Sequence, residues 1–399
     1  MNLRVVLLGY IVRGPLGGLA WHHLQYALGL SRLGADVLFV EDSTDSPWCC
    51  YDPSRHVTDA DPTFGLAFAD RAFAALGLRE RWAYYDAHRS CWLGPRADDA
   101  AATCASADVV LNLGGVNPLR DWSMAPAVRI LVDTDPVFTQ IRHLTDPAAM
   151  ELAAAHTHFM SFGENVRRAG CTIPDDGLAW SPTRQPVCLD IWDAPRGSVR
   201  AAFTTVMQWD SYPTREHDGV RYGMKSDSFA PYASLPRVAP ESLELAVTGP
   251  SAPRAELLAG GWGLADPLEV AREPDDYRDY IRRSKGEFTV AKHGYVVSNS
   301  GWFSERTAAY LASGRPAVVQ ETGFSQWLQR DSGVLSFRNP AEAVEGLRYV
   351  GARYEHHSRA AREIAEEYFD ADKVLTDLLE RAAAVEISPT TSGSGGGRR

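Results

Sequence analysis

A strand–turn–helix–strand pattern opens this sequence and constrains its fold more than any other feature. The apolar run LRVVLLGYIV (residues 3–12) is followed by the turn RGPLGG, by a segment with helical spacing that ends at Gly34, and by a second apolar run, DVLFVED (36–42). Two parallel strands need such a crossover connection between them. The pattern therefore predicts an α/β fold built on a parallel sheet.

The same logic recurs along the 399 residues, which are too many for one ordinary core. Further strands are expected at 107–115, 128–135, 158–165, 243–249, 287–297 and 316–323, and helices at 64–77, 97–105, 253–260 and 274–286. Residues 208–242 are expected to form a long irregular loop. Two doubly wound, Rossmann-like domains that face each other across a ligand-binding cleft are therefore predicted.

The expected domain limits follow from composition. We place the first domain at 1–190, ending in a Pro-marked connector, and the second at 191–354. A Glu/Arg/Ala-rich helix is expected at 355–385. The Gly/Ser-rich tail at 386–399 is expected to be disordered.

Composition and charge exclude several classes of function. Hydrophobic residues make up 45% and charged residues 23%, without a run of about 20 apolar residues, so neither a membrane span nor a membrane partner is expected. A net charge of −11 argues against binding to a nucleic-acid polymer. The six cysteines form no C-x-x-C pair, which favours reduced thiols and a cytoplasmic location. The oligomeric state, a homodimer included, stays open.

The segment NSGWFSERTAAYLASGRP (299–316) carries the strongest functional signal. Ser304 is a good N-cap, and Gly314 and Pro316 end the short helix. Free amides and the positive end of the helix dipole can hold a phosphate there, and Gly301 lets an anion approach the backbone. Glu305, in the first helical turn, can accept hydrogen bonds from a ribose diol.

A second turn follows the next predicted strand, at Glu321, Thr322, Gly323 and Phe324. Two neighbouring strand ends would then present exposed amides to the cleft. Together they predict a nucleotide-sugar pocket. Lys225, in the 208–242 loop, is the candidate basic partner of the diphosphate.

Residues 300–324, SGWFSERTAAYLASGRPAVVQETGF, resemble the donor-binding segment of the GT-B-fold glycosyltransferases. The resemblance implies that Gly301, Ser304 and Gly323 lie near the diphosphate, Glu305 at the ribose and Glu321 near the sugar hydroxyls, with Trp302, Phe303, Thr322 and Phe324 in the same donor site. It also implies that the C-terminal helix crosses back to the first domain. Two departures stand out: Asn299 replaces the usual loop histidine, and Val297 replaces the first glutamate of the E-x7-E pair.

In that fold the catalytic base comes from the first domain. His22 and His23, in the first turn of the helix after RGPLGG, are candidates, and because they are adjacent at most one can face the cleft. Asp133 and Asp135 follow a strand, where one of them would orient the histidine or hold the acceptor. Their D-x-D spacing also resembles the Mn²⁺ motif of GT-A enzymes, an alternative that we keep open.

The acceptor is expected against the first domain. Gly17, Gly18, Asp135, Glu164 and Asn165 are the candidate contacts. Aromatic residues are dense in that domain, most of them expected in the core, and the remainder suggest a planar acceptor held by stacking: Trp21, Trp48, Tyr51, Trp82, Tyr84, Tyr85 and Trp92.

The sequence thus predicts a glycosyltransferase that moves a sugar from a UDP- or dTDP-sugar to a hydroxyl of a small acceptor such as a nucleoside or an aromatic natural product. We expect inversion and no metal or other cofactor. An NAD(P)-dependent oxidoreductase remains an alternative, because GYIVRGPLGG followed by Glu41 imitates a dinucleotide-binding start. A sugar-nucleotide epimerase and a non-catalytic binding module are the others.

Overall fold

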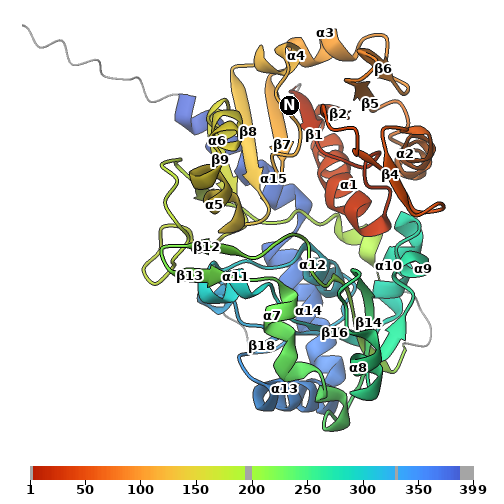
Figure 1. Ribbon diagram of the computed structural model, residues 1–399, viewed down its shortest axis with the longest axis vertical. Helices are drawn as coiled ribbons and strands as arrows, with labels where there is room; N and C mark the ends of the chain where they lie inside the picture. Colours follow the sequence, from red (N-terminus) through yellow and green to blue (C-terminus); the bar gives the residue numbers. More distant parts are fainter. Residues whose placement is uncertain (1–2, 194–199, 329–330, 387–399) are drawn as a thin grey trace, which may run out of the picture.

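The chain folds into two α/β lobes stacked along the long axis of the molecule (Figure 1). The computed structural model describes residues 3–193, 200–328 and 331–386. Each lobe is built on one sheet of mainly parallel strands, as the opening pattern predicts.

The first lobe contains an eight-stranded sheet in the order β10-β9-β8-β7-β1-β2-β5-β6, in which only β6 is antiparallel to its neighbour. Its central strands are apolar because both faces are covered by helices. The strands are β1 (Arg4–Leu8), β2 (Asp36–Asp42), β5 (Trp82–Asp86), β6 (Cys91–Leu93), β7 (Val109–Leu113), β8 (Val128–Asp133), β9 (His158–Ser161) and β10 (Ser181–Pro182). The helices are α1 (Gly17–Arg32), α2 (Thr63–Ala75), α3 (Ala100–Ala105), α4 (Asp121–Met124), α5 (Phe138–Thr145) and α6 (Pro147–Ala154), and β3 (Cys50–Asp52) and β4 (Val57–Asp59) form a separate hairpin.

The second lobe contains a six-stranded, fully parallel sheet in the order β15-β14-β11-β16-β17-β18. The order reverses on either side of β11, which is the doubly wound arrangement. The strands are β11 (Ala202–Gln208), β14 (Ser242–Thr248), β15 (Gly263–Ala265), β16 (Gly286–Thr289), β17 (Ala317–Gln320) and β18 (Val334–Phe337). The helices are α7 (Lys225–Phe229), α8 (Arg254–Ala259), α9 (Pro267–Val270), α10 (Pro274–Arg283), α11 (His293–Val297), α12 (Glu305–Ala312) and α13 (Pro340–Ala352).

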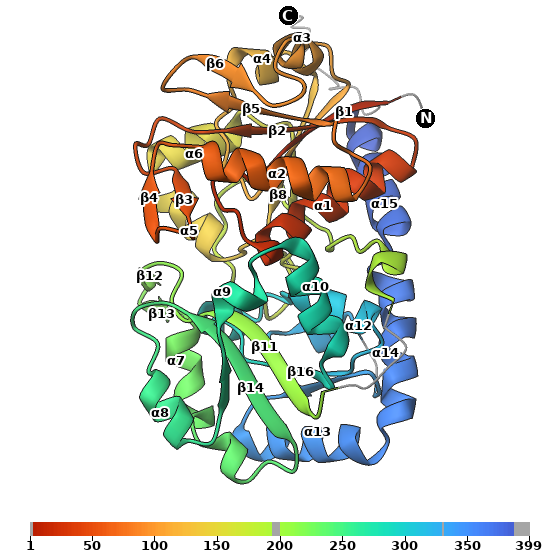
Figure 2. The same ribbon diagram turned by 90° about the vertical axis from the view of Figure 1, so that its right-hand side faces the viewer.

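Two segments cross between the lobes and meet. The first runs from β10 through the 3₁₀ turn at Leu189–Trp192, and the second joins α14 (Tyr354–Tyr368) to α15 (Ala371–Glu386). Val187 N–H donates to the Phe369 carbonyl at 2.7 Å, and Ala371 N–H donates to the Val187 carbonyl at 3.0 Å. α15 lies along the first lobe, as the resemblance implies (Figure 2).

Three element predictions need correction. The strand expected at 287–297 ends at Thr289 and is followed by helix α11, because Ala291 N–H bonds to the Gln320 side chain and His293 N–H to the Met224 carbonyl instead of continuing the sheet. The loop expected at 208–242 contains the hairpin β12 (Arg215–His217)–β13 (Val220–Tyr222), helix α7 and two 3₁₀ turns. The helix expected at 355–385 is broken between α14 and α15, and the tail from residue 387 lies outside the described residues.

Candidate active site

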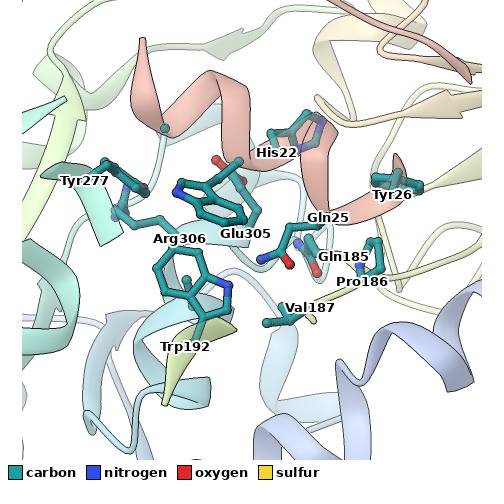
Figure 3. Close-up of a pocket in the computed structure, with 13 residues that line it drawn as sticks. His22, Gln25, Tyr26, Gln185, Pro186, Val187, Trp192, Tyr277, Glu305 and Arg306 are labelled. Carbon is teal, nitrogen blue, oxygen red and sulfur yellow. The ribbon is translucent and has the colours of Figure 1, made fainter. Parts of the chain in front are cut away.

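A small cavity lies where α1 of the first lobe faces α12 of the second (Figure 3). Its volume of about 20 Å³ has room for about one water molecule, which is too little for a substrate. The lining side chains come from four parts of the chain: Gly18, Trp21, His22, Gln25, Tyr26, Gln185, Pro186, Val187, Trp192, Tyr277, Glu305, Arg306 and Ala309.

The two adjacent histidines have different environments. His22 is half-buried, lines the cavity, and has a pKa lowered by burial and partly restored by the negative charge of Glu305. His23 is fully buried: Nε2 accepts from the Tyr10 amide at 3.2 Å, and Nδ1 lies 2.8 Å from the Leu19 carbonyl. Both ring nitrogens of His23 are used, and burial lowers its pKa strongly. The prediction of His23 as a base is therefore wrong, and His22 is the histidine that faces the cleft.

Three cations of the second lobe converge near α12. Lys225, at the start of α7, is 9% exposed and has no hydrogen-bond or ion-pair partner within the described part of the chain. Burial, followed by the charges of Arg306 and Lys292, lowers the pKa of Lys225 to about 7. A buried ammonium without a counter-ion is costly, which marks this place as a site for an anion.

The other two cations have partners. Arg306 pairs with Glu287 at 2.6 Å and also donates to the Thr289 hydroxyl at 2.8 Å. Lys292 donates to Asp135 of the first lobe at 2.9 Å and to the Tyr212 hydroxyl at 2.9 Å. Of the three, Lys225 is therefore the one left to meet a ligand in this arrangement.

Helix α12 begins as predicted. The Ser304 hydroxyl caps it by accepting from the Arg306 amide at 3.2 Å. Glu305 follows, and its side chain points into the cavity toward the first lobe (Figure 3).

The two glycine turns do not present free amides to the cleft, in contrast to the prediction. Gly301 N–H donates to the Thr322 carbonyl at 2.8 Å, and Gly323 N–H donates to the Glu321 carboxylate at 2.7 Å. Asn165 of the first lobe covers both turns, donating from Nδ2 to the carbonyls of Asn299 at 3.0 Å and Gly323 at 2.9 Å. A Cβ on Gly301 would lie 2.7 Å from the Asn165 side chain. The absence of a side chain at Gly301 and Gly323 is thus explained by the close approach of the first lobe. Asn165 holds the two lobes together and is not free to contact an acceptor.

Most of the other predicted donor contacts are buried. Phe303 and Phe324 lie in the core with ring centroids 5.3 Å apart, and Trp302 stacks on Tyr295 at 4.3 Å. The Thr322 hydroxyl donates to the Trp302 carbonyl at 2.6 Å. Glu321, besides holding its own turn, pairs with Arg338 at 3.5 Å. None of these side chains lines the cavity between α1 and α12. Thr322 and Glu321 instead hold the turns around Gly301 and Gly323.

The aspartates of the D-x-D pattern point in different directions. Asp133 is buried within the first lobe, where it accepts from Gln140 at 3.1 Å and from the Ser161 hydroxyl at 2.7 Å, and burial raises its pKa. It therefore neither touches a histidine nor faces the cleft, so its catalytic assignment is wrong. Asp135 instead crosses to the second lobe and binds Lys292, with the hydroxyls of Tyr212 and Tyr295 also donating to it. In a D-x-D metal site the carboxylates of Asp133 and Asp135 would have to converge on one ion, and here they point to different partners.

Of the five predicted acceptor contacts, Gly18 lines the cavity, and the others are bonded to protein groups. Gly17 N–H donates to the Ala271 carbonyl at 2.7 Å, and Gly18 lies against Tyr277. Glu164 is buried and pairs with Arg184. Of the aromatic residues, Trp21, Trp82 and Tyr84 belong to the core, whereas Trp48 is 72% exposed.

Sequence reasoning missed Tyr10, Arg306, Lys292 and Tyr277. Arg306 directly follows Glu305 in the segment that carried the functional signal, so its charge was an available clue. Lys292 was hidden because it lies in a segment expected to be a strand. Within the described residues, no group of three His, Cys, Asp or Glu side chains is placed to hold a metal ion, and no helix is long and apolar enough to cross a membrane.

Comparison with known proteins gives the fold. Residues 233–380 match the family model described as glycosyl transferase-like, while no curated protein sequence matches the chain significantly. An alpha-glucosyltransferase (AGT) in complex with UDP superposes with a TM-score of 0.58 at 9% identity, covering 96% of this chain and 100% of that one. Anabaena Alr3699/HepE in complex with UDP-glucose gives 0.59 at 10% identity, covering 96% and 100%. The protein has the GT-B fold.

A third GT-B structure, AviGT4, a glycosyltransferase involved in Avilamycin A biosynthesis, gives a TM-score of 0.54 at 12% identity over 97% of this chain and 99% of that one. The family match in the second lobe and the UDP-bound GT-B neighbours together support a glycosyltransferase.

Proposed function

We propose that this protein transfers a sugar from a UDP-sugar, or alternatively a dTDP-sugar, to a hydroxyl of a small acceptor, with inversion and without a metal ion. The observation that carries the proposal is Lys225, a buried cation without a counter-ion beside Arg306 and the first turn of α12. A diphosphate supplies the missing negative charge, and the cluster stabilises the charge that develops on the leaving group.

The donor diphosphate lies against Lys225, Ser304 and the α12 amides, and the GT-B neighbours bound to UDP or UDP-glucose support that nucleotide. His22 takes the proton of the attacking hydroxyl. Lys225 supplies positive charge of the kind that Mn²⁺ supplies in other enzymes, which supports a metal-free reaction. Because the cavity is too small for a nucleotide sugar, the lobes separate to admit the donor.

For the acceptor we propose a nucleoside or an aromatic compound. Trp48, exposed after β2, offers a stacking surface, and the net charge of −11 disfavours a nucleic-acid polymer. Three of the alpha-glucosyltransferase neighbours are complexes with DNA, so short DNA belongs among the acceptors to be tested.

The oxidoreductase alternative loses its support in the first lobe. The Glu41 carboxylate accepts from the amides of Ile11, Val12 and Arg13 at 2.5–2.7 Å. In a dinucleotide-binding domain the amides after the first strand bind the pyrophosphate. Here the Glu41 carboxylate occupies them, so the pyrophosphate of a dinucleotide could not bind.

A nucleotide screen followed by a transfer assay tests the proposal. UDP or dTDP should raise the melting temperature more than GDP or ADP, because a ligand at 100 times its Kd adds about 2.7 kcal/mol of stability. Transfer from the matching sugar nucleotide to a nucleoside or phenol should survive EDTA. Loss of transfer in EDTA that Mn²⁺ restores would contradict the metal-free reaction, and no stabilisation by any nucleoside diphosphate would contradict the donor class.

A further inference from the structure

Glu305 is a cleft carboxylate that the donor site does not explain. It opens α12 and lines the cavity, yet its carboxylate has no hydrogen-bond or ion-pair partner among residues 3–193, 200–328 and 331–386. Its negative charge raises the pKa of Tyr10 and of His22 in the opposite lobe. It acts in the same direction on Lys225, Tyr277 and Arg306 of its own lobe. Beside a diphosphate its negative charge would be repelled, so a role toward the first lobe is physically more favourable.

The surroundings of His22 contain one negative charge. On α1 its neighbours are the neutral His23, with ring centroids 4.9 Å apart, and Tyr26, at 6.3 Å. Phe162, which follows β9, packs against it at 6.2 Å and carries no charge. From the second lobe, Tyr277, Arg306 and Glu305 line the same cavity, and of these only Glu305 can stabilise a protonated imidazole.

We propose that Glu305 is a positioning residue for His22, and that closure of the two lobes assembles a histidine–carboxylate pair from α1 and α12. This proposal rests on the proposed function, in which His22 is the base. It assigns Glu305 to the acid–base machinery in place of the ribose contact expected from the resemblance.

The reaction balances as follows. His22 accepts the proton of the acceptor hydroxyl while the acceptor oxygen bonds to the anomeric carbon and the bond from that carbon to the diphosphate oxygen breaks. The nucleoside diphosphate leaves with the electron pair and remains beside Lys225, and the imidazolium formed at His22 faces the Glu305 carboxylate. When the lobes open, the imidazolium returns its proton to solvent.

The electrostatics of the cavity agree with this role. Burial lowers the pKa of His22, and Glu305 opposes that effect. Without the carboxylate, the imidazole should be a weaker base still. The buried His23 cannot take the place of His22 as the base, because its ring nitrogens already bond to the Tyr10 amide and the Leu19 carbonyl.

Glu305→Gln tests the pairing through two readouts. In the pH profile of kcat/KM, the acidic limb should move to lower pH by about one unit. The imidazole titration of His22, followed by NMR with His22→Ala to assign the signal, should move in the same direction and by a similar amount. UDP affinity should change less than about threefold, because the carboxylate does not hold the nucleotide. Glu269→Gln, an exposed glutamate in the first turn of α9, is the matched control and should change neither readout.

The outcomes separate the two proposals. An unmoved His22 titration, or a tenfold loss of UDP affinity with an unmoved profile, would overturn the pairing and return Glu305 to the ribose. A shifted His22 titration in a protein that transfers no sugar would support the pairing and contradict the proposed function.

Discussion

At the scale of single residues, we expect Lys225 to be the main cationic contact of the donor diphosphate. Because its pKa is about 7, a large fraction of the ammonium is neutral at pH 8, and binding of UDP should draw in a proton. Calorimetry in buffers of different ionisation enthalpy should therefore show proton uptake at pH 8 in the wild type. Lys225→Met should lose that uptake and bind UDP about 10–100-fold more weakly. Lys373→Met, an exposed lysine on α15, is the control and should bind normally.

In the absence of ligand, the buried Lys225 should lower the free energy of unfolding of the protein. The pKa of Lys225 falls from an ordinary 10.5 to about 7 on folding, so the unfolded chain holds the extra proton between these values and stability rises with pH across that window. Below pH 7 the full cost of the buried charge is present. Lys225→Met should therefore melt several degrees higher than the wild type at pH 6.5, and the difference should shrink toward pH 10. An equal difference at both pH values would show that Lys225 is not desolvated.

The adjacent histidines should separate by experiment. His22→Ala should lower kcat about 10²–10⁴-fold with little change in melting temperature, because it loses a base and no internal hydrogen bond. His23→Ala should lower the melting temperature, because it leaves the Tyr10 amide and the Leu19 carbonyl without their partner. Full activity in His22→Ala would place the base elsewhere.

At the scale of elements, the turn before α12 packs directly against Asn165 of the first lobe. Gly301 has a φ of +73°, and a side chain there would collide with Asn165. Gly301→Ala should therefore destabilise the protein by about 1–3 kcal/mol, seen as a lower melting temperature. Gly219→Ala, at a φ of +75° with open space around it, is the control for backbone strain alone and should be milder.

The elements also show what a sequence can and cannot predict. Helix α12, its Ser304 cap and the strand β17 after it are specified locally, by apolar runs and by residues that start or stop helices, so they could be predicted. Asn165 and Gly301 are 136 positions apart, and no pattern in either segment of the sequence predicts their contact. The same holds for Asp133: its place at a strand end was predictable, but its burial by Gln140 and Ser161 depends on how α5 and β9 pack.

At the scale of the molecule, the two lobes meet through apolar as well as polar contacts. Phe138 of the first lobe packs against Tyr212 and Tyr295 of the second, with ring centroids 5.2 and 5.7 Å apart. Asn165, Asp135 and Gly17 each bond across the boundary. The crossing segments meet near Val187 and Phe369, and Arg362 of α14 also donates to the Leu189 carbonyl at 3.2 Å. α15 packs against α1 of the first lobe, and α14 packs against α12 of the second (Figure 2). In the proposed mechanism, proton transfer therefore depends on the contact between the lobes, because His22 lies on α1 and Glu305 on α12.

The most direct test of the account is a crystal structure of the protein with UDP. We expect the β-phosphate within hydrogen-bonding distance of Lys225 Nζ and of the first amides of α12, with His22 on the opposite wall. A diphosphate bound elsewhere, for example on the loop that Glu41 now holds, would contradict the central claim.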